Sequence, residues 1–200
     1  MRDQKPAILA FAVLAIAVAL AAIYWTFQGE SNDAAGKTLS KLDAFAVGAM
    51  TNFTVSGDPA VPGAVSFIDG TGAERSLEDW RGKVLLVNLW ATWCAPCRHE
   101  MPALDRLEKA LGGPDFEVLA ISLDRGGLDL PRDFYAEIGI EHLDLYNDAT
   151  ARAGVTLGAF GMPTTVLIDR DGRLVGRLVG PAEWDAPEAL ALIAAAIEGD

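Results

Sequence analysis

The chain is poor in the side chains that most often bind metals or nucleic acids or build a covalent framework. Its 200 residues include 2 cysteines, 2 histidines, and 16 lysines and arginines against 28 acidic residues. The net charge of −12 argues against a nucleic-acid partner and against a basic membrane-binding face. The sequence also lacks internal repeats and a glycine-rich phosphate loop. We therefore predict no nucleic-acid partner and no bound cofactor.

The two cysteines, Cys94 and Cys97, are separated by only two residues. A disulfide across so short a loop removes little chain entropy, so a purely structural role is disfavoured. A zinc site needs about four ligands, and only His99 and His142 could supplement the pair. Two buried, inert thiols are also disfavoured, because Pro96 and the start of a helix place Cys94 at a surface edge. The spacing favours a redox-active dithiol and no metal site.

The residues around the cysteines predict a strand followed by a helix. Residues 84–90 form a continuous apolar run, which is typical of a strand buried on both faces. From residue 95 onward a helical stripe of apolar residues ends at a pair of glycines (Met101, Leu104, Leu107, Leu111). Cys94 is then at the helix N-terminus, where free N–H groups and the helix dipole favour a thiolate. Cys97 lies one turn further in and is expected to be less accessible.

One long hydrophobic run, residues 7–27, lies near the N-terminus. It carries Thr26 as its only polar side chain, and a helix of this length spans about 31 Å, which matches the hydrocarbon core of a bilayer. Basic residues precede the run and acidic residues follow it (Arg2, Lys5, Glu30 and Asp33). The positive-inside rule therefore places the N-terminus in the cytoplasm and the rest of the chain outside.

We accordingly expect a cytoplasmic tail, a transmembrane anchor, a tether with an N-terminal extension, and a catalytic domain (residues 1–6, 7–27, 28–57 and 58–200). A signal peptide cleaved after residues 19–21 is the alternative, although the run exceeds the usual 7–15 residues of such a segment. In both cases the domain is exported to an oxidising compartment.

The pattern of the exported part predicts an α/β domain. Strands are expected at residues 66–68, 84–90, 116–123, 143–146, 164–169 and 173–179, the last two as a hairpin. Helices are expected at residues 95–111, 131–138, from 148 to about 158, and 186–197, with a helical turn at 76–80. Residues 38–55 suggest a short helix and a strand, and turn residues 57–63 mark the start of the core domain.

This order of elements resembles the thioredoxin superfamily. Three segments are similar to the TlpA family of membrane-anchored bacterial thiol:disulfide oxidoreductases: Asn-Leu-Trp-Ala-Thr-Trp-Cys-Ala-Pro-Cys-Arg-His-Glu-Met-Pro at 88–102, Phe-Gly-Met-Pro-Thr-Thr at 160–165, and Gly-Pro-Ala-Glu-Trp at 180–184. The resemblance covers about residues 38–200 and includes an extra helix and strand at 131–146. It implies a thioredoxin-like fold, with a central mixed sheet flanked by helices, after one transmembrane helix. It also implies a place in the bacterial inner membrane with the catalytic domain in the periplasm.

The resemblance also implies roles for individual residues. Cys94 matches the attacking cysteine and Cys97 the resolving one. Met162 and Pro163 match a cis-proline loop that packs beside the dithiol and offers its backbone to an incoming peptide; an ordinary trans turn is the alternative. Trp93 matches an aromatic residue that shields the edge of the active site, with a core tryptophan as the alternative.

One departure from ordinary thioredoxin concerns proton transfer. Asn88 stands where thioredoxin has a buried aspartate, and an amide cannot take a proton from the resolving thiol. Close relatives place a glutamate three residues after the second cysteine, as Glu100 does here. From one helical turn away, Glu100 could exchange a proton with Cys97. The alternative is a solvated glutamate on the helix surface, and His99 and His142 are also expected at the surface.

We therefore predict an exported thiol:disulfide oxidoreductase that acts as a reductant. The residues between the cysteines carry no cation that would over-stabilise the Cys94 thiolate, which favours this direction. The resemblance implies partners with disulfides among the maturation factors of cytochrome c or of the copper site of cytochrome oxidase. A separate membrane thiol reductase would supply the electrons, since the chain has no flavin or nicotinamide site.

Two other classes of protein are alternatives for this domain. A copper-delivery protein of the Sco type places its cysteines three residues apart and needs a partner histidine, whereas the spacing here is two. A thiol peroxidase of the peroxiredoxin type needs a Pro-x-x-x-Thr-x-x-Cys loop, which this sequence lacks.

The anchor can be tested by cell fractionation and N-terminal sequencing. We expect the mature protein to sediment with membranes and to retain residues 7–27, because the run is long enough to span a bilayer. Recovery of a soluble form that starts near Ala22 would identify the run as a cleaved signal instead.

Overall fold

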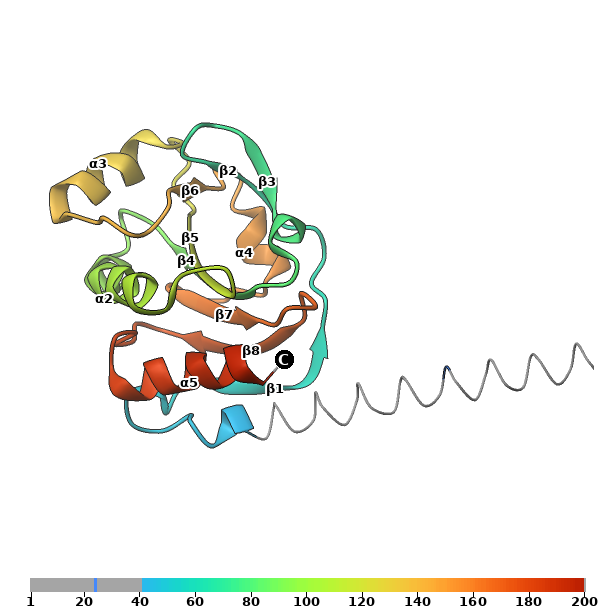
Figure 1. Cartoon of the computed structure of the whole chain (residues 1–200). Coiled ribbons are helices and arrows are strands. Elements are labelled where there is room, and N and C mark those ends of the chain that lie inside the picture. The colour runs from blue at the N-terminus through green and yellow to red at the C-terminus, as the bar shows by residue number, and fades with distance from the viewer. Residues whose placement is uncertain (1–23, 25–40, 200) are drawn as a thin grey trace, which may run out of the picture. The chain divides into compact units, whose positions relative to one another are not determined.

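An eight-stranded mixed sheet forms the centre of the domain in this computed structural model, in the order β1-β8-β7-β4-β5-β6-β2-β3 (Figure 1). The strands are β1 (Thr54–Ala60), β2 (Ser66–Asp69), β3 (Glu74–Ser76), β4 (Val84–Trp90), β5 (Phe116–Ser122), β6 (Tyr146–Asn147), β7 (Thr164–Ile168) and β8 (Leu174–Val179). Strands β4, β5 and β6 pair in parallel, and the other neighbouring strands pair antiparallel.

The structure describes Tyr24 and residues 41–199, and contacts between residues group Thr38–Asp200 into one unit. The expected anchor therefore lies outside the described residues, apart from Tyr24. Within the described part of the chain, no helix is long and apolar enough to cross a membrane.

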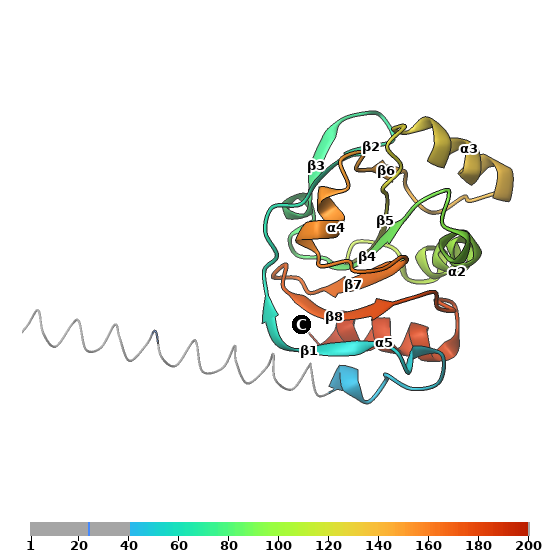
Figure 2. The same cartoon turned by 180° about the vertical axis from the view of Figure 1, so that it is seen from behind.

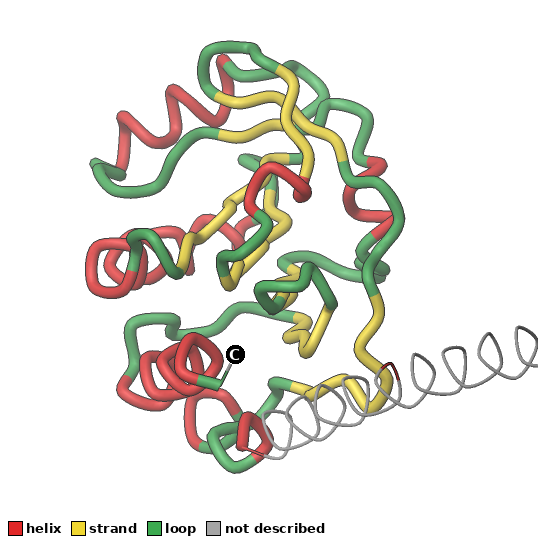
Figure 3. The backbone as a smooth tube through the Cα atoms, turned by 45° about the vertical axis from the view of Figure 1, so that its right-hand side comes forward, coloured by secondary structure: helices red, strands yellow, loops and turns green. Residues whose placement is uncertain are grey.

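Helices cover both faces of the sheet. They are α2 (Ala95–Leu111), α3 (Asp129–Ile138), α4 (Arg152–Thr156) and α5 (Pro187–Glu198), with single 3-10 turns at η1 (Gly48–Met50) and η2 (Leu77–Trp80). Side chains of α2, α3 and α5 belong to one apolar cluster, and those of α4 and β2 belong to the cluster on the opposite face. In Figure 1, α5 lies in front of β1 and β8, and in the reverse view of Figure 2 it lies behind them. Helix α5 contacts η1, so both ends of the domain lie together, as the tube in Figure 3 shows.

Strand β4 separates the two apolar layers. All seven of its residues are buried, as predicted for a central strand with a parallel neighbour. Leu86 and Trp90 face the layer of α2 and α5, whereas Leu85 and Leu89 face the layer of α4. Burying each such aliphatic side chain contributes about 1.5–3 kcal/mol, so the strand is firmly held on both faces.

Several elements differ from their predicted bounds. Residues 57–60 were expected to form a turn, but strand β1 continues through them. The strand lies at the edge of the sheet, and its pairing with β8 is irregular between Val55 and Ala60, so it can accommodate Pro59. Strand β3 was not predicted, and β6 covers Tyr146–Asn147 rather than 143–146. Helix α4 is limited to five residues, and Gly158 follows it with a positive φ of 66°.

A close approach of β8 to the preceding segment generates a stability prediction. Gly176 is covered by the ring of Phe53, and a Cβ at this position would overlap that ring. We expect Gly176→Ala to lower the free energy of unfolding by roughly 1–3 kcal/mol through overpacking. Urea unfolding followed by tryptophan fluorescence measures the change. Gly57→Ala serves as the control, because a Cβ there meets no atom within 4 Å, and an equal loss in both variants would contradict the interpretation.

Candidate active site

The chain leaves β4 at Trp90 and enters α2 within five residues, with Cys94 as the N-cap of the helix. The Cys94 sulfur accepts a hydrogen bond from the Cys97 N–H at 3.3 Å, and the two side chains form a disulfide across a Cα–Cα distance of 5.3 Å. Cys94 retains 6% exposure and Cys97 has none. The cap position satisfies a helix N–H that would otherwise lack a partner, and it places the Cys94 sulfur at the positive end of the helix dipole. Once reduced, Cys94 is therefore the sulfur that the helix stabilises as a thiolate.

The cis-proline loop lies at the same edge of the sheet as the disulfide. The bond between Met162 and Pro163 is cis, which excludes the trans alternative. Strand β7 begins immediately after it, and Thr164 pairs with Leu89 near the end of β4. Because the pairing is antiparallel, the start of β7 and the end of β4 meet, and the two loops are neighbours.

Two large apolar side chains on these loops face solvent. Trp93, next to Cys94, is 69% exposed, so the alternative of a core tryptophan is wrong. Phe160, three residues before Pro163, is 95% exposed. Exposed apolar side chains on the two loops that meet at the disulfide suit contact with another polypeptide.

Glu100 lies on α2, one turn after Cys97, and is buried, with only 3% of its surface exposed. The alternative of a solvated surface glutamate is therefore wrong. Its Oε1 accepts a hydrogen bond from Asn88 Nδ2 at 2.8 Å. Its Oε2 accepts two, from the Ala182 N–H and from Trp184 Nε1, both at 3.1 Å. Burial raises the pKa of the Glu100 carboxyl from 4.5 to about 7, although these three donors favour the charged form.

The groups that hold Glu100 were not predicted from the sequence. The sequence indicates only that Asn88 cannot accept a proton; in the structure its Nδ2 also donates to Thr165 Oγ1 at 2.9 Å. Ala182 and Trp184 belong to the Gly-Pro-Ala-Glu-Trp segment, for which the sequence predicts no role, and Trp184 is completely buried. The spacing between Glu100 and Trp184, 84 positions along the chain, carries no local signal of contact. The contact could have been predicted only by proposing that the segment at 180–184 packs against a buried carboxylate.

The two histidines differ in their surroundings: His99 lies on α2 and His142 follows α3. His99 is exposed, and the Nδ1 of His142 lies 3.2 Å from Asp105 Oδ2. No group of three or more histidine, cysteine, aspartate or glutamate side chains in the described part of the chain could hold a metal ion.

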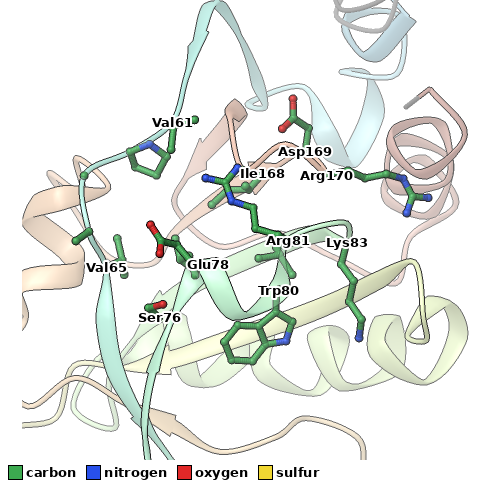
Figure 4. A pocket seen from close by; sticks show the side chains of 16 residues that line it. Val61, Val65, Ser76, Glu78, Trp80, Arg81, Lys83, Ile168, Asp169 and Arg170 are labelled. Atoms are coloured by element: carbon green, nitrogen blue, oxygen red, sulfur yellow. The ribbon is translucent and has the colours of Figure 1, made fainter.

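A separate pocket lies at the other end of β4, among the loop before β2, η2 and the β7–β8 turn (Figure 4). Its volume is about 110 Å³, and its walls combine apolar side chains such as Val65 and Ile168 with Glu78 and Arg81. Its lining shares no residue with the disulfide site.

A disulfide at a helix N-terminus, beside a cis-proline loop and on a mixed sheet, defines the class of thioredoxin-like dithiol proteins. The chain belongs to the Redoxin family, whose sequence model matches residues 55–193. A solved structure from Chlorobium tepidum, described as a candidate thiol:disulfide interchange protein DsbE, is 29% identical with a TM-score of 0.62. The match covers 71% of this chain and 99% of that one, which confirms the predicted thioredoxin-like fold.

Two curated relatives have similar sequences. The thiol:disulfide interchange protein HelX of Rhodobacter capsulatus is 36% identical over 121 residues, which are 59% of this chain and 66% of HelX. The thiol-disulfide oxidoreductase ResA of Bacillus thuringiensis is 30% identical over 115 residues, which are 56% of this chain and 64% of ResA. The alignments thus span slightly less than two thirds of each relative.

Proposed function

We propose that this chain is a membrane-anchored thiol:disulfide oxidoreductase of the TlpA type that reduces disulfides of exported partner proteins in the periplasm. The observation that carries the proposal is the Cys94–Cys97 disulfide at the start of α2, in which Cys94 is slightly exposed and Cys97 is sealed. The printed names of the relatives HelX and ResA describe the same kind of chemistry and support it.

The reaction divides the work between the two sulfurs. In the reduced protein, the Cys94 thiolate attacks a partner disulfide, forms a mixed disulfide and expels one partner thiolate. Cys97 then loses its proton and attacks the Cys94 sulfur, which expels the second partner thiolate and leaves the Cys94–Cys97 disulfide. Two electrons pass to the partner. A membrane thiol reductase, as the TlpA resemblance implies, returns the pair to the dithiol form.

Glu100 accepts the proton that Cys97 must lose. With a pKa of about 7, the carboxyl is partly ionised near neutral pH and can both take up and release a proton. It lies one helical turn after Cys97. It takes the role of the buried aspartate of thioredoxin, which is replaced here by Asn88. Glu100 also lines a surface hollow together with His99, Glu183 and Glu188, through which the proton can pass to solvent.

The loops around the disulfide receive the partner. The backbone at Met162 and Pro163 binds an extended partner segment, and the exposed rings of Trp93 and Phe160 contact its apolar side chains. The TlpA resemblance points to maturation factors of cytochrome c or of the copper site of cytochrome oxidase as these partners.

The assignment of the two cysteines can be tested by trapping. We expect Cys97→Ser to accumulate a mixed disulfide with partner proteins, visible on non-reducing gels and dissolved by dithiothreitol, because the second attack is blocked. Cys94→Ser should abolish turnover and trapping. In the reduced wild type, alkylation at neutral pH should label Cys94 well before Cys97, since Cys97 is fully buried. Faster labelling of Cys97, or trapping by Cys94→Ser, would reverse the assignment.

The role of Glu100 can be tested through the pH dependence of resolution. We expect Glu100→Gln to slow the attack of Cys97 on a mixed disulfide by about 10²-fold or more and to remove the inflection near pH 7. Stopped-flow kinetics with a preformed mixed disulfide measures this step. The fold should tolerate the change, because Asn88 Oδ1 has no hydrogen-bond partner among the described residues and a turn of this amide would present it to the new NH₂ group. The same turn moves Asn88 Nδ2 away from Thr165, whose hydroxyl can then donate to Oδ1 instead.

A matched control for this experiment is Glu108→Gln. Burial also raises the pKa of Glu108 to about 7, but its carboxylate accepts a hydrogen bond from the Val118 N–H at 2.7 Å and does not contact the site. We expect this variant to leave the pH profile of resolution unchanged. Equal profiles for wild type and Glu100→Gln would show that Glu100 serves only the fold.

The same pKa shift predicts how stability varies with pH. The folded state binds a proton at Glu100 more tightly than the unfolded chain, since its pKa rises from 4.5 to about 7. The stabilisation from this proton is complete below about pH 4.5 and is lost as the pH rises to about 7, a change of up to about 3 kcal/mol. Urea unfolding of wild type should show this loss over that range, and Glu100→Gln should show less of it. An unchanged slope in the variant would contradict the shift.

A further inference from the structure

The turn between β4 and α2 is held by a carboxylate that lies outside the dithiol motif. Asp124 follows β5 and is 1% exposed. Its Oδ2 accepts hydrogen bonds from the Thr92 N–H at 2.9 Å and from Ser122 Oγ at 2.8 Å. Its Oδ1 accepts one from Thr92 Oγ1 at 2.8 Å. Both oxygens of Asp124 therefore contact the residue two positions before Cys94.

The position of Asp124 follows from the parallel pairing of β4 with β5. The last ladder pair is Trp90 with Ser122, and one further bond runs from the Leu123 N–H to the Trp90 carbonyl at 2.8 Å. Beyond this point the acceptor for the Thr92 N–H is the Asp124 carboxylate instead of a backbone carbonyl. The side chain thus ends the ladder and fixes the direction in which the chain leaves β4 for α2.

Asp124 is itself held in place. Asn147 Nδ2 donates to the Asp124 carbonyl at 3.0 Å and to the Ser122 carbonyl at 3.1 Å. The Asp124 N–H donates to Ser122 Oγ at 3.1 Å. Because Asp124 is fixed at the end of β5, its hydrogen bonds to Thr92 also fix the turn that bears Trp93 and Cys94.

We propose that Asp124 is a positioning residue for the dithiol: through Thr92 it fixes the turn from which Cys94 attacks a disulfide. Exchange requires the attacking sulfur to approach the disulfide within a narrow range of distance and direction, so a looser turn costs rate even where the fold is retained. This inference rests on the proposed function, because it assigns Asp124 a part in that exchange.

A second buried aspartate provides a matched control. Asp148 is 4% exposed and accepts three hydrogen bonds, two of which come from the N–H and the Oγ1 of Thr150, at 2.9 and 2.6 Å. The third comes from the Ala153 N–H at 2.8 Å. Asp148 thus repeats the bonding of Asp124, but it stabilises the start of α4 and makes no bond to the β4–α2 turn.

The test compares Asp124→Ala with Asp148→Ala in the full-length, reduced protein. We expect Asp124→Ala to lower the second-order rate constant for attack on a peptide disulfide by about tenfold. Asp148→Ala, which loses the same number of bonds, should leave this rate within about twofold. Equal rates in the two variants, whether both lowered or both unchanged, would overturn the proposal.

If Asp124→Ala does not fold, a double-mutant cycle of Asp124→Asn with Thr92→Val replaces it. Each change weakens the same contact, so we expect the double variant to be little slower than the slower single variant, with Thr92→Ser retaining the wild-type rate. Additive losses, or no loss, would overturn the proposal.

Amide hydrogen exchange separates this inference from the proposed function. Loss of the Asp124 carboxylate should increase exchange at residues 92–94, and Asp148→Ala should increase it at residues 150–153 instead. If wild type fails to reduce the peptide disulfide while exchange follows this pattern, the proposed function is wrong and the structural part of the inference stands. If exchange at residues 92–94 is unchanged in the Asp124 variant, the inference fails whatever the activity.

Discussion

Strand β4 is buried along its whole length, and the arrangement of the site follows from that constraint. Because both faces of the strand are covered, the chain can reach solvent only beyond its end, where α2 begins with Cys94 as its cap. The parallel neighbour β5 ends at the same edge and presents Asp124 there. The antiparallel neighbour β7 starts at that edge and presents the cis peptide of Pro163. Three chain segments thus meet at one place because each is paired with β4 in a defined direction.

The layer between β4 and α2 is apolar except for the buried carboxylate of Glu100 and the side chains that bind it. Removing a carboxylate from water is costly, and Glu100 is tolerated because three donors contact it, one from β4 and two from the segment at 182–184. The same burial moves its pKa into the neutral range, so one arrangement links the C-terminal segment to the helix and prepares a group for proton transfer. Replacing Asn88 by an ionised aspartate would place a second negative charge against Glu100, which explains why an amide suits this position.

Much of the fold could be predicted from residue patterns, because it depends on local periodicity. The run of β4, which is apolar except for Asn88, the helical stripe that ends at Gly112, and the hairpin at Asp171 and Gly172 each leave a signal within a few residues. Strand β1 did not, since a stretch containing Gly57 and Pro59 has the composition of a turn and becomes a strand only by pairing with β8. Strand β6 has two residues and is likewise defined by its neighbours, β5 and β2.

The sequence by itself determined the pair of cysteines, their place at a helix start and the class of redox chemistry, because these depend on residues adjacent in the chain. The tertiary structure decided that Trp93 is exposed, that Glu100 is buried, and that Trp184 and Asn88 hold it. It also decided that Asp124, 30 positions after Cys94, holds the turn before that cysteine. Burial and hydrogen bonding between distant segments depend on how strands pair and helices pack. A carboxylate at a given position reads the same in the sequence whether it faces water or a closed layer of side chains.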